Sequence, residues 1–163
     1  LAPAKQVAQT TPGLNMQVTD GYYLNTRLLK DAMAPVKETK VISETRELTS
    51  YVKTDESMRG VNQYAAVATG YVNIPEDGVY YFSSDLEEVW IDGKLLINNA
   101  NEVKRFSRND NSVALAKGLH EIKAVFLGHI IGGWPSNWND GSINIRKSDA
   151  EKFTKIDGKM LCH

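Results

Sequence analysis

The sequence is short of cysteine, of excess charge and of long apolar runs. Its single cysteine, Cys162, excludes an intrachain disulfide, and one thiol cannot form a zinc cluster alone. Lys and Arg number 19 against 20 Asp and Glu, so the basic surplus expected of a nucleic-acid binder is absent. No apolar run approaches the ~18 residues of a membrane helix. These absences argue against a disulfide scaffold, a nucleic-acid partner and a helical membrane protein.

The remaining composition is that of an ordinary globular domain. The chain has 163 residues, of which 42% are hydrophobic and 24% charged. This length suits one domain with a sizeable buried core. The chain opens at Leu1 without a Met, a basic n-region or an apolar h-region. We therefore expect no signal peptide in it and a start inside a longer protein.

Short β-prone segments separated by turns dominate the sequence from Gln63 onward. Residues 64–74 alternate, and Asp92-Gly93 is a preferred type I′ hairpin pair between 89–91 and 94–97. Further strands are expected at residues 79–82, 113–116, 120–127 and 142–146. Long helices do not alternate with these strands, so a parallel α/β fold is not expected. The pattern predicts an all-β fold, an antiparallel sandwich or barrel.

The two ends and the region before Gln63 are less regular. Residues 1–12 contain two prolines and no periodicity, and are expected to form a linker or an extended arm, with a disordered end as the alternative. The domain itself is expected to span 13–147. The tail, 148–163, either docks through its few apolar residues or frays. Within 23–62, a short helix from Arg27 ends before Pro35, and Val36–Val52 allows both strand and short helix.

No catalytic motif is present in the sequence. Nucleophile-elbow, metalloprotease, phosphate-loop and dinucleotide-binding signatures are all absent. His120 and His129 lie nine residues apart, which would place them on opposite faces of a continuous strand. We expect them to be structural or surface residues. Cys162 is near a chain end that would not hold a nucleophile in place, and we expect this chain alone not to be an enzyme.

An acidic cluster, residues 85–88, lies between two expected strands. Carboxylates in a loop suit Ca²⁺, which takes six to eight oxygen ligands, and Asp85 is the candidate. The alternative is a solvated loop whose acids keep the hairpin soluble. No other cofactor is indicated.

A long glycine-rich segment, residues 128–141, contains two tryptophans among several amides. Aromatic rings stack on sugar C–H faces, and amides and carboxylates bind hydroxyls. The residues with this chemistry are Trp134, Trp138, Asn139 and Asp140, with Asp85 and Glu87 expected across from them. The alternative is that both tryptophans are buried and hold the loop to the domain.

Three blocks of the sequence resemble the protective-antigen (PA-14) family. They are residues 70–82 (GYVNIPEDGVYYF), 84–97 (SDLEEVWIDGKLLI) and 113–123 (VALAKGLHEIK), in the order and spacing of that family. The resemblance implies a β-sandwich, usually non-catalytic, appended to glycosidases, adhesins and toxins. Sugar-binding members hold calcium with two consecutive aspartates, where this sequence has Asp85 and Leu86.

The acidic block together with residues 130–135 (IIGGWP) looks like the C-terminal domain of certain Bacteroidetes family-20 glycoside hydrolases, the β-N-acetylhexosaminidases. The resemblance implies a non-catalytic accessory domain of a secreted or periplasmic glycosidase, with a glycan or the upstream catalytic domain as its partner. It also implies that residues 1–12 are a linker. We expect a monomer. The alternative is a structural spacer with no ligand.

Overall fold

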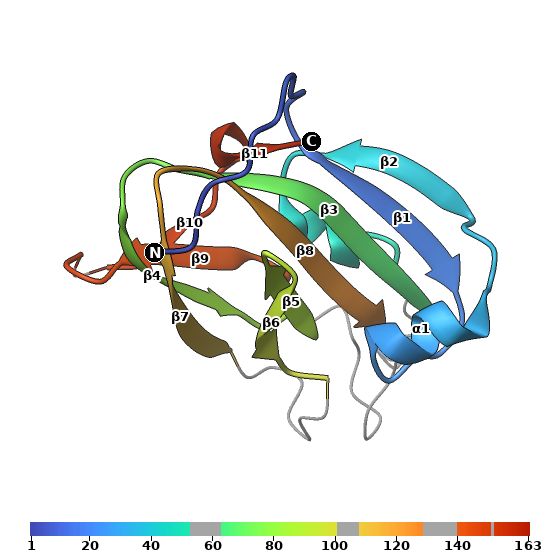
Figure 1. The fold of residues 1–163 in the computed structure, drawn as a ribbon. Coiled ribbons are helices and arrows are strands. Elements are labelled where there is room, and N and C mark those ends of the chain that lie inside the picture. The colour runs from blue at the N-terminus through green and yellow to red at the C-terminus, as the bar shows by residue number, and fades with distance from the viewer. Residues whose placement is uncertain (53–62, 101–107, 129–139, 151) are drawn as a thin grey trace.

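The computed structural model describes residues 1–52, 63–100, 108–128, 140–150 and 152–163. In these ranges two antiparallel sheets pack face to face (Figure 1), which confirms the predicted β-sandwich with short helical insertions. None of the helices in this part of the chain has the length and apolar character needed to cross a bilayer.

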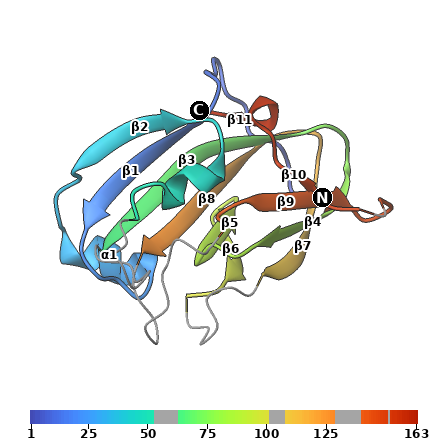
Figure 2. The same ribbon diagram turned by 180° about the vertical axis from the view of Figure 1, so that it is seen from behind.

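The larger sheet has seven strands in the order β2-β1-β3-β8-β5-β6, with β11 also paired to β3. Its strands are β1 (Leu14–Asp20), β2 (Glu38–Ile42), β3 (Tyr64–Ile74), β5 (Glu88–Ile91), β6 (Lys94–Asn98), β8 (Gly118–Gly128) and β11 (Leu161–Cys162). The smaller sheet, in front in Figure 2, has the order β10-β9-β4-β7. Its strands are β4 (Gly78–Ser84), β7 (Asn109–Leu115), β9 (Ile143–Lys147) and β10 (Thr154–Lys155).

Strands β3 and β8 form the centre of the larger sheet. They pair antiparallel over eleven residues, from Tyr64 opposite Gly128 to Ile74 opposite Gly118. Alternate side chains of both strands point to the inner face, where Ala66, Phe126 and their neighbours are fully buried against Phe82 of the smaller sheet. The strand predicted from the alternation of residues 64–74 is therefore confirmed.

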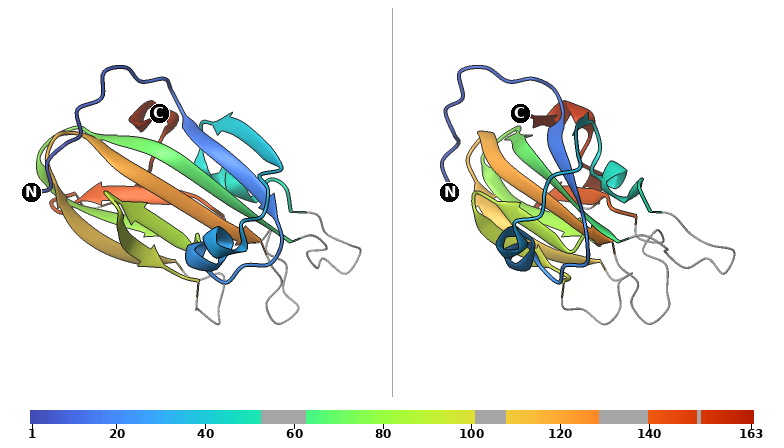
Figure 3. Two further views of the ribbon diagram at one scale, coloured as in Figure 1. Left: turned by 45° about the vertical axis from the view of Figure 1, so that its right-hand side comes forward. Right: turned by 90° about the vertical axis from the view of Figure 1, so that its right-hand side faces the viewer.

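The region before Gln63 contains both kinds of element that the sequence allowed. Helix α1 (Thr26–Ala32) crosses the outer face of the larger sheet, as both views in Figure 3 show. The short helix η1 (Thr45–Thr49) lies on the inner face, where buried Leu48 joins the core. The Tyr64 hydroxyl donates to the Leu48 carbonyl at 2.8 Å and anchors η1 there.

The hairpin turn between β5 and β6 has the predicted conformation. Asp92 and Gly93 both have positive φ, 51° and 77°. Asp92 is also anchored to β8, because its Oδ1 accepts the Glu121 N–H at 2.9 Å. This bond and the Asp92 N–H bond to the Glu121 carbonyl tie the turn to the central strands.

The two terminal segments lie side by side against the core. Thr11 and His163 exchange two backbone hydrogen bonds, both 2.8 Å, and the Ala2 N–H donates to the Ala114 carbonyl. Residues 1–12 therefore run along the domain as a hydrogen-bonded arm, and their role as a linker stays a prediction. The tail docks through η3 (Gly158–Met160) and β11, with Leu161 only 1% exposed.

Gly70 on β3 makes room for the tail. A Cβ at this position would lie 2.3 Å from the Cys162 carbonyl oxygen and 2.7 Å from Leu14 Cδ2. We expect Gly70→Ala to displace β11 and to lower the free energy of unfolding by about 1–3 kcal/mol. Denaturant titration measures the loss. The exposed Asn73→Ala on the same strand is the control and should change stability by less than about 0.5 kcal/mol. Equal stability of the two variants would contradict the tight fit.

Candidate functional site

The acidic cluster lies at one end of the sandwich, between β4 and β5, and it is buried. Asp85, Glu87 and Glu88 are 5%, 3% and 2% exposed, and Leu86 is fully buried. The alternative of a solvated loop is therefore wrong. Buried carboxylates need hydrogen-bond donors, because an unpaired charge in a low-dielectric interior is costly. Each of the three carboxylates accepts hydrogen bonds from a different segment of the chain.

Asp85 holds the segment that follows residue 139. Its Oδ2 accepts the Asp140 N–H at 2.7 Å and its Oδ1 accepts the Gly141 N–H at 2.8 Å. Gly141 has a φ of 73°, which favours glycine and lets the two successive N–H groups point at one carboxylate. Thr45 of η1 supports the same turn, since its hydroxyl donates to the Gly141 carbonyl.

Glu87 holds the other flank of the segment 129–139. Its Oε2 accepts the Leu127 N–H at 2.8 Å, next to the last residue of β8. Asp85 and Glu87, two residues apart, therefore fasten the chain on both sides of that segment. Because each carboxylate accepts backbone N–H groups on one flank, the two side chains position the ends of the segment 129–139.

Glu88 fastens a third segment, on the outer face of the larger sheet. Its Oε2 accepts the Thr26 N–H at 2.8 Å, at the first residue of α1. Its Oε1 accepts both the Thr26 hydroxyl and the Trp90 Nε1–H, each at 2.8 Å. The helix and the indole are thus fixed by one carboxylate.

Neutral side chains complete the scaffold of the acidic loop. The Asn99 Nδ2 group donates to the Ser84 carbonyl at 3.0 Å and to the Leu86 carbonyl at 2.8 Å. The Ser84 hydroxyl donates to the Ser142 carbonyl. These bonds satisfy the Ser84 and Leu86 carbonyl groups and tie the acidic loop to Asn99 and Ser142.

The pKa values of Asp85 and Asp140 are shifted in opposite directions. Burial raises the pKa of the Asp85 carboxyl, and the N–H groups of Gly141 and Asp140 counter only part of that rise. Asp140 is 44% exposed in its side chain and lies 3.3 Å from Arg108. Partial burial pushes its pKa upward, but the Ser142 hydroxyl and the nearby cations Lys155 and Arg108 outweigh this and hold the pKa of Asp140 below its usual value.

The described residues do not by themselves fit a calcium ion. No group of three or more His, Cys, Asp or Glu suited to a metal gathers in the part of the chain that the structure describes. Both Asp85 oxygens accept N–H groups, and the second aspartate of the calcium-binding members is replaced by buried Leu86.

The expected sugar contacts divide into two groups. Asp85, Glu87 and Asp140 lie at this end of the sandwich, and a backbone hydrogen bond joins Asp85 to Asp140. Trp134, Trp138 and Asn139 lie outside the described residues, as does His129. Their assignment as sugar contacts stays a prediction, as does direct sugar contact by the two buried carboxylates.

His120 is structural, as the sequence indicated. It is fully buried, with Nδ1 2.7 Å from Asp92 Oδ2 and Nε2 2.8 Å from the Ala116 carbonyl oxygen. A hydrolase dyad would leave the second nitrogen facing a nucleophile. Here that nitrogen faces a backbone acceptor inside the protein, so the pair cross-links β8 to the β5–β6 turn.

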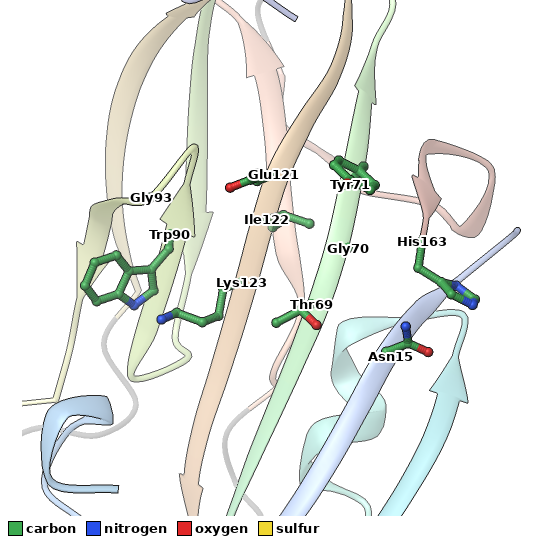
Figure 4. Close-up of a pocket in the computed structure, with 10 residues that line it drawn as sticks. All are labelled: Asn15, Thr69, Gly70, Tyr71, Trp90, Gly93, Glu121, Ile122, Lys123 and His163. Atoms are coloured by element: carbon green, nitrogen blue, oxygen red, sulfur yellow. The ribbon is translucent and has the colours of Figure 1, made fainter. Parts of the chain in front are cut away.

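Trp90, for which the sequence suggested no role, lies on the outer face of the larger sheet. The Lys123 ammonium lies over its indole, 4.3 Å from the ring centroid, in a cation–π contact. Figure 4 shows the two side chains next to each other on β5 and β8, with Thr69, Tyr71, Asn15 and His163 farther across the sheet. These residues line an open hollow of about 550 Å³. The alternation of residues in β5 is enough to predict that Trp90 points outward. Its neighbour Lys123 follows only from the register between β5 and β8.

Comparison with known proteins settles the family. The profile of the PA14 domain matches residues 18–158, most of the chain. The chain belongs to the PA14 domain family. The resemblance inferred from the three sequence blocks is thereby confirmed, and the match includes much of the docked tail.

The relatives of this PA14 domain include a β-hexosaminidase of Porphyromonas gingivalis. The two are 39% identical over 156 residues, which is 96% of this chain and 20% of that protein. The chain thus spans about a fifth of the length of the curated relative that it matches. It corresponds to one part of that larger protein.

Solved structures of other proteins share the fold. The A domain of epithelial adhesin 9 from Candida glabrata, in complex with Galβ1-3GlcNAc, has a TM-score of 0.58 at 10% identity, over 98% of this chain and 92% of that one. An anti-sigma factor domain-containing protein from Clostridium clariflavum has a TM-score of 0.64 at 17% identity, over 93% and 47%. At such identities these similarities concern the fold alone.

The Asp85 contacts of this PA14 domain can be tested with an amide. In Asp85→Asn an NH2 group replaces one carboxylate oxygen. This donor would then face the backbone N–H group that the oxygen had accepted. We expect the free energy of unfolding to fall by about 1–3 kcal/mol, because one buried donor loses its acceptor. Denaturant titration measures the change, and amide exchange at Asp140 and Gly141 should accelerate. The exposed Asp110→Asn on β7 is the control; a loss no larger than the control's would refute the proposed support.

Proposed function

We propose that this PA14 domain is a non-catalytic accessory domain of a secreted or periplasmic glycoside hydrolase of the β-hexosaminidase type. In this role it binds glycan weakly or packs on the catalytic domain. The observation that carries the proposal is that nearly the whole chain aligns, at 39% identity, with one fifth of a β-hexosaminidase. We further propose that it acts as a monomer.

The buried carboxylates support a binding role for the end of the sandwich at which they lie. Trp134, Trp138 and Asn139 belong to the segment whose flanks Asp85 and Glu87 hold. A scaffold that fixes both flanks lowers the ordering cost when such a segment engages a ligand. Weak affinity is expected, because an exposed sugar keeps good hydrogen bonds to water and offers little apolar area.

The alternative, packing on a neighbouring domain without a ligand, is supported by a cluster of exposed apolar side chains. They fall within one segment around α1: Tyr22 (47% exposed), Leu24 (44%), Leu28 (37%), Met33 (88%) and Val36 (47%). Several large apolar side chains exposed within one short segment are typical of an interface.

Tryptophan substitutions test the glycan proposal. Trp134→Ala and Trp138→Ala should each weaken binding of an N-acetylhexosamine oligosaccharide by about tenfold, if each indole contributes about 1.4 kcal/mol of stacking. Isothermal titration measures the change, and unfolding curves show whether each variant remains folded.

The exposed aromatic Tyr22 provides a matched control. Tyr22→Ala should leave sugar affinity unchanged. If neither tryptophan variant differs from this control, or if the unaltered chain binds no N-acetylhexosamine glycan at all, the glycan role of the loop end is refuted and the packing role stands.

Calcium removal gives an independent test. We expect EDTA to leave the melting temperature unchanged, because both oxygens of the candidate ligand Asp85 already accept backbone N–H groups, whereas a bound ion would stabilise the folded state. Differential scanning calorimetry with EDTA and then with excess Ca²⁺ measures this. A fall in EDTA that Ca²⁺ reverses would establish calcium as a cofactor.

A further inference from the structure

A row of four outward side chains crosses the larger sheet away from the loop end discussed above. Asn15 on β1 pairs with Thr69 on β3, Thr69 with Lys123 on β8, and Lys123 with Trp90 on β5. Adjacent strands lie about 4.8 Å apart, so the row is about 14 Å long. That is the length of a short oligosaccharide.

Two open hollows flank this row and share Trp90 and Lys123. The first, of about 550 Å³, extends towards Tyr71 and His163 (Figure 4). The second, of about 500 Å³, extends towards α1 and includes Gln17. The Trp90–Lys123 pair therefore stands at the centre of one continuous shallow surface.

The second hollow is positively charged. Arg27, Lys30 and Lys123 line it and its described lining contains no carboxylate, whereas Glu121 lines the first hollow. Arg27 and Lys30 are exposed on α1, whose position is fixed by the bonds from Thr26 to Glu88. The cations thus belong to a supported element, although the chain as a whole carries a net charge of −1.

The Trp90 ring is held in place before any ligand arrives. Its Nε1–H is donated to Glu88 at 2.8 Å, so the ring does not need to be ordered on binding. The Lys123 ammonium lies 4.3 Å from the ring centroid and is attracted by the ring, and within the described residues no hydrogen bond fixes it as Glu88 fixes the indole. A flexible ammonium of this kind can turn towards an arriving anion while the ring accepts a sugar face.

We propose that this outer face binds an anionic saccharide. The ring of one sugar unit stacks on Trp90, its carboxylate or sulfate group pairs with Lys123 and the α1 cations, and Thr69 and Asn15 hydrogen-bond the next units. The proposal goes beyond the loop-end site and does not depend on it.

A peptide strand is a poorer fit to this surface. β3 is paired to β1 and β8, and β8 to β3 and β5, so neither central strand has a free edge along the row. β-Strand addition requires such an edge. Recognition must therefore come from side chains, and an aromatic ring beside cations suits a charged sugar.

The test compares two probes on the intact 163-residue chain: a hyaluronan tetrasaccharide, which alternates uronate and N-acetylglucosamine, and neutral chitotetraose. We expect the hyaluronan probe to bind more tightly, to shift the NMR signals of Lys123 and the Trp90 indole, and to weaken as salt rises. Lys123→Met, which keeps the aliphatic stem, should weaken it by about tenfold.

Further variants separate this site from the loop end. Trp90→Phe keeps an aromatic ring if Trp90→Ala fails to fold, and it should also weaken the hyaluronan probe. Trp134→Ala, Trp138→Ala and the control Lys40→Met, which removes an exposed cation from β2, should leave the hyaluronan-induced NMR shifts of Lys123 and the Trp90 indole unchanged.

Three results would overturn the proposal. The first is no binding of hyaluronan, or a Lys123→Met variant that weakens the binding of hyaluronan and chitotetraose equally. The second is an effect confined to the Trp134 and Trp138 variants, which would assign all sugar binding to the loop end. The third is equally tight, Lys123-dependent binding of a tetraglutamate peptide, which would show that the surface recognises negative charge alone.

Discussion

The cost of burying a carboxylate organises this end of the molecule. Asp85, Glu87 and Glu88 are almost wholly removed from water within four residues of chain, and each must be matched by donors. The donors come from the turn at 140–141, from the end of β8 and from the start of α1. One short loop therefore holds three segments that lie 40 to 62 residues away from it in the sequence.

Much of the fold follows from local pattern. The predicted ranges 64–74 and 120–127 nearly coincide with β3 and β8, because alternation, turn residues and a two-sided core all favour the same arrangement there. The region 23–62 was less determined. β2 is an edge strand whose side chains are mostly exposed, and η1 is fixed by tertiary contacts such as Tyr64 to Leu48. Neither leaves a periodic signal in the sequence.

The site was harder to predict than the fold. The sequence identified Asp85 and Glu87 as candidate sugar contacts, which stays a prediction, but it gave no sign that both accept backbone N–H groups. Backbone donors have no sequence signature, and their partners are set by register and loop path. Trp90 shows the complementary case: its outward direction follows from alternation, yet its pairing with Lys123 depends on β5 lying beside β8.

The pairing of the two terminal segments has a mechanical consequence. Thr11 and His163 face each other in an antiparallel arrangement, and Pro12 bridges to Cys162. The chain before Thr11 and the chain end at His163 leave this pair on the same side. A pulling force applied at those two points would break the hydrogen bonds of this pair one after another. It would detach β11 from β3 before the long β3–β8 pairing came under load.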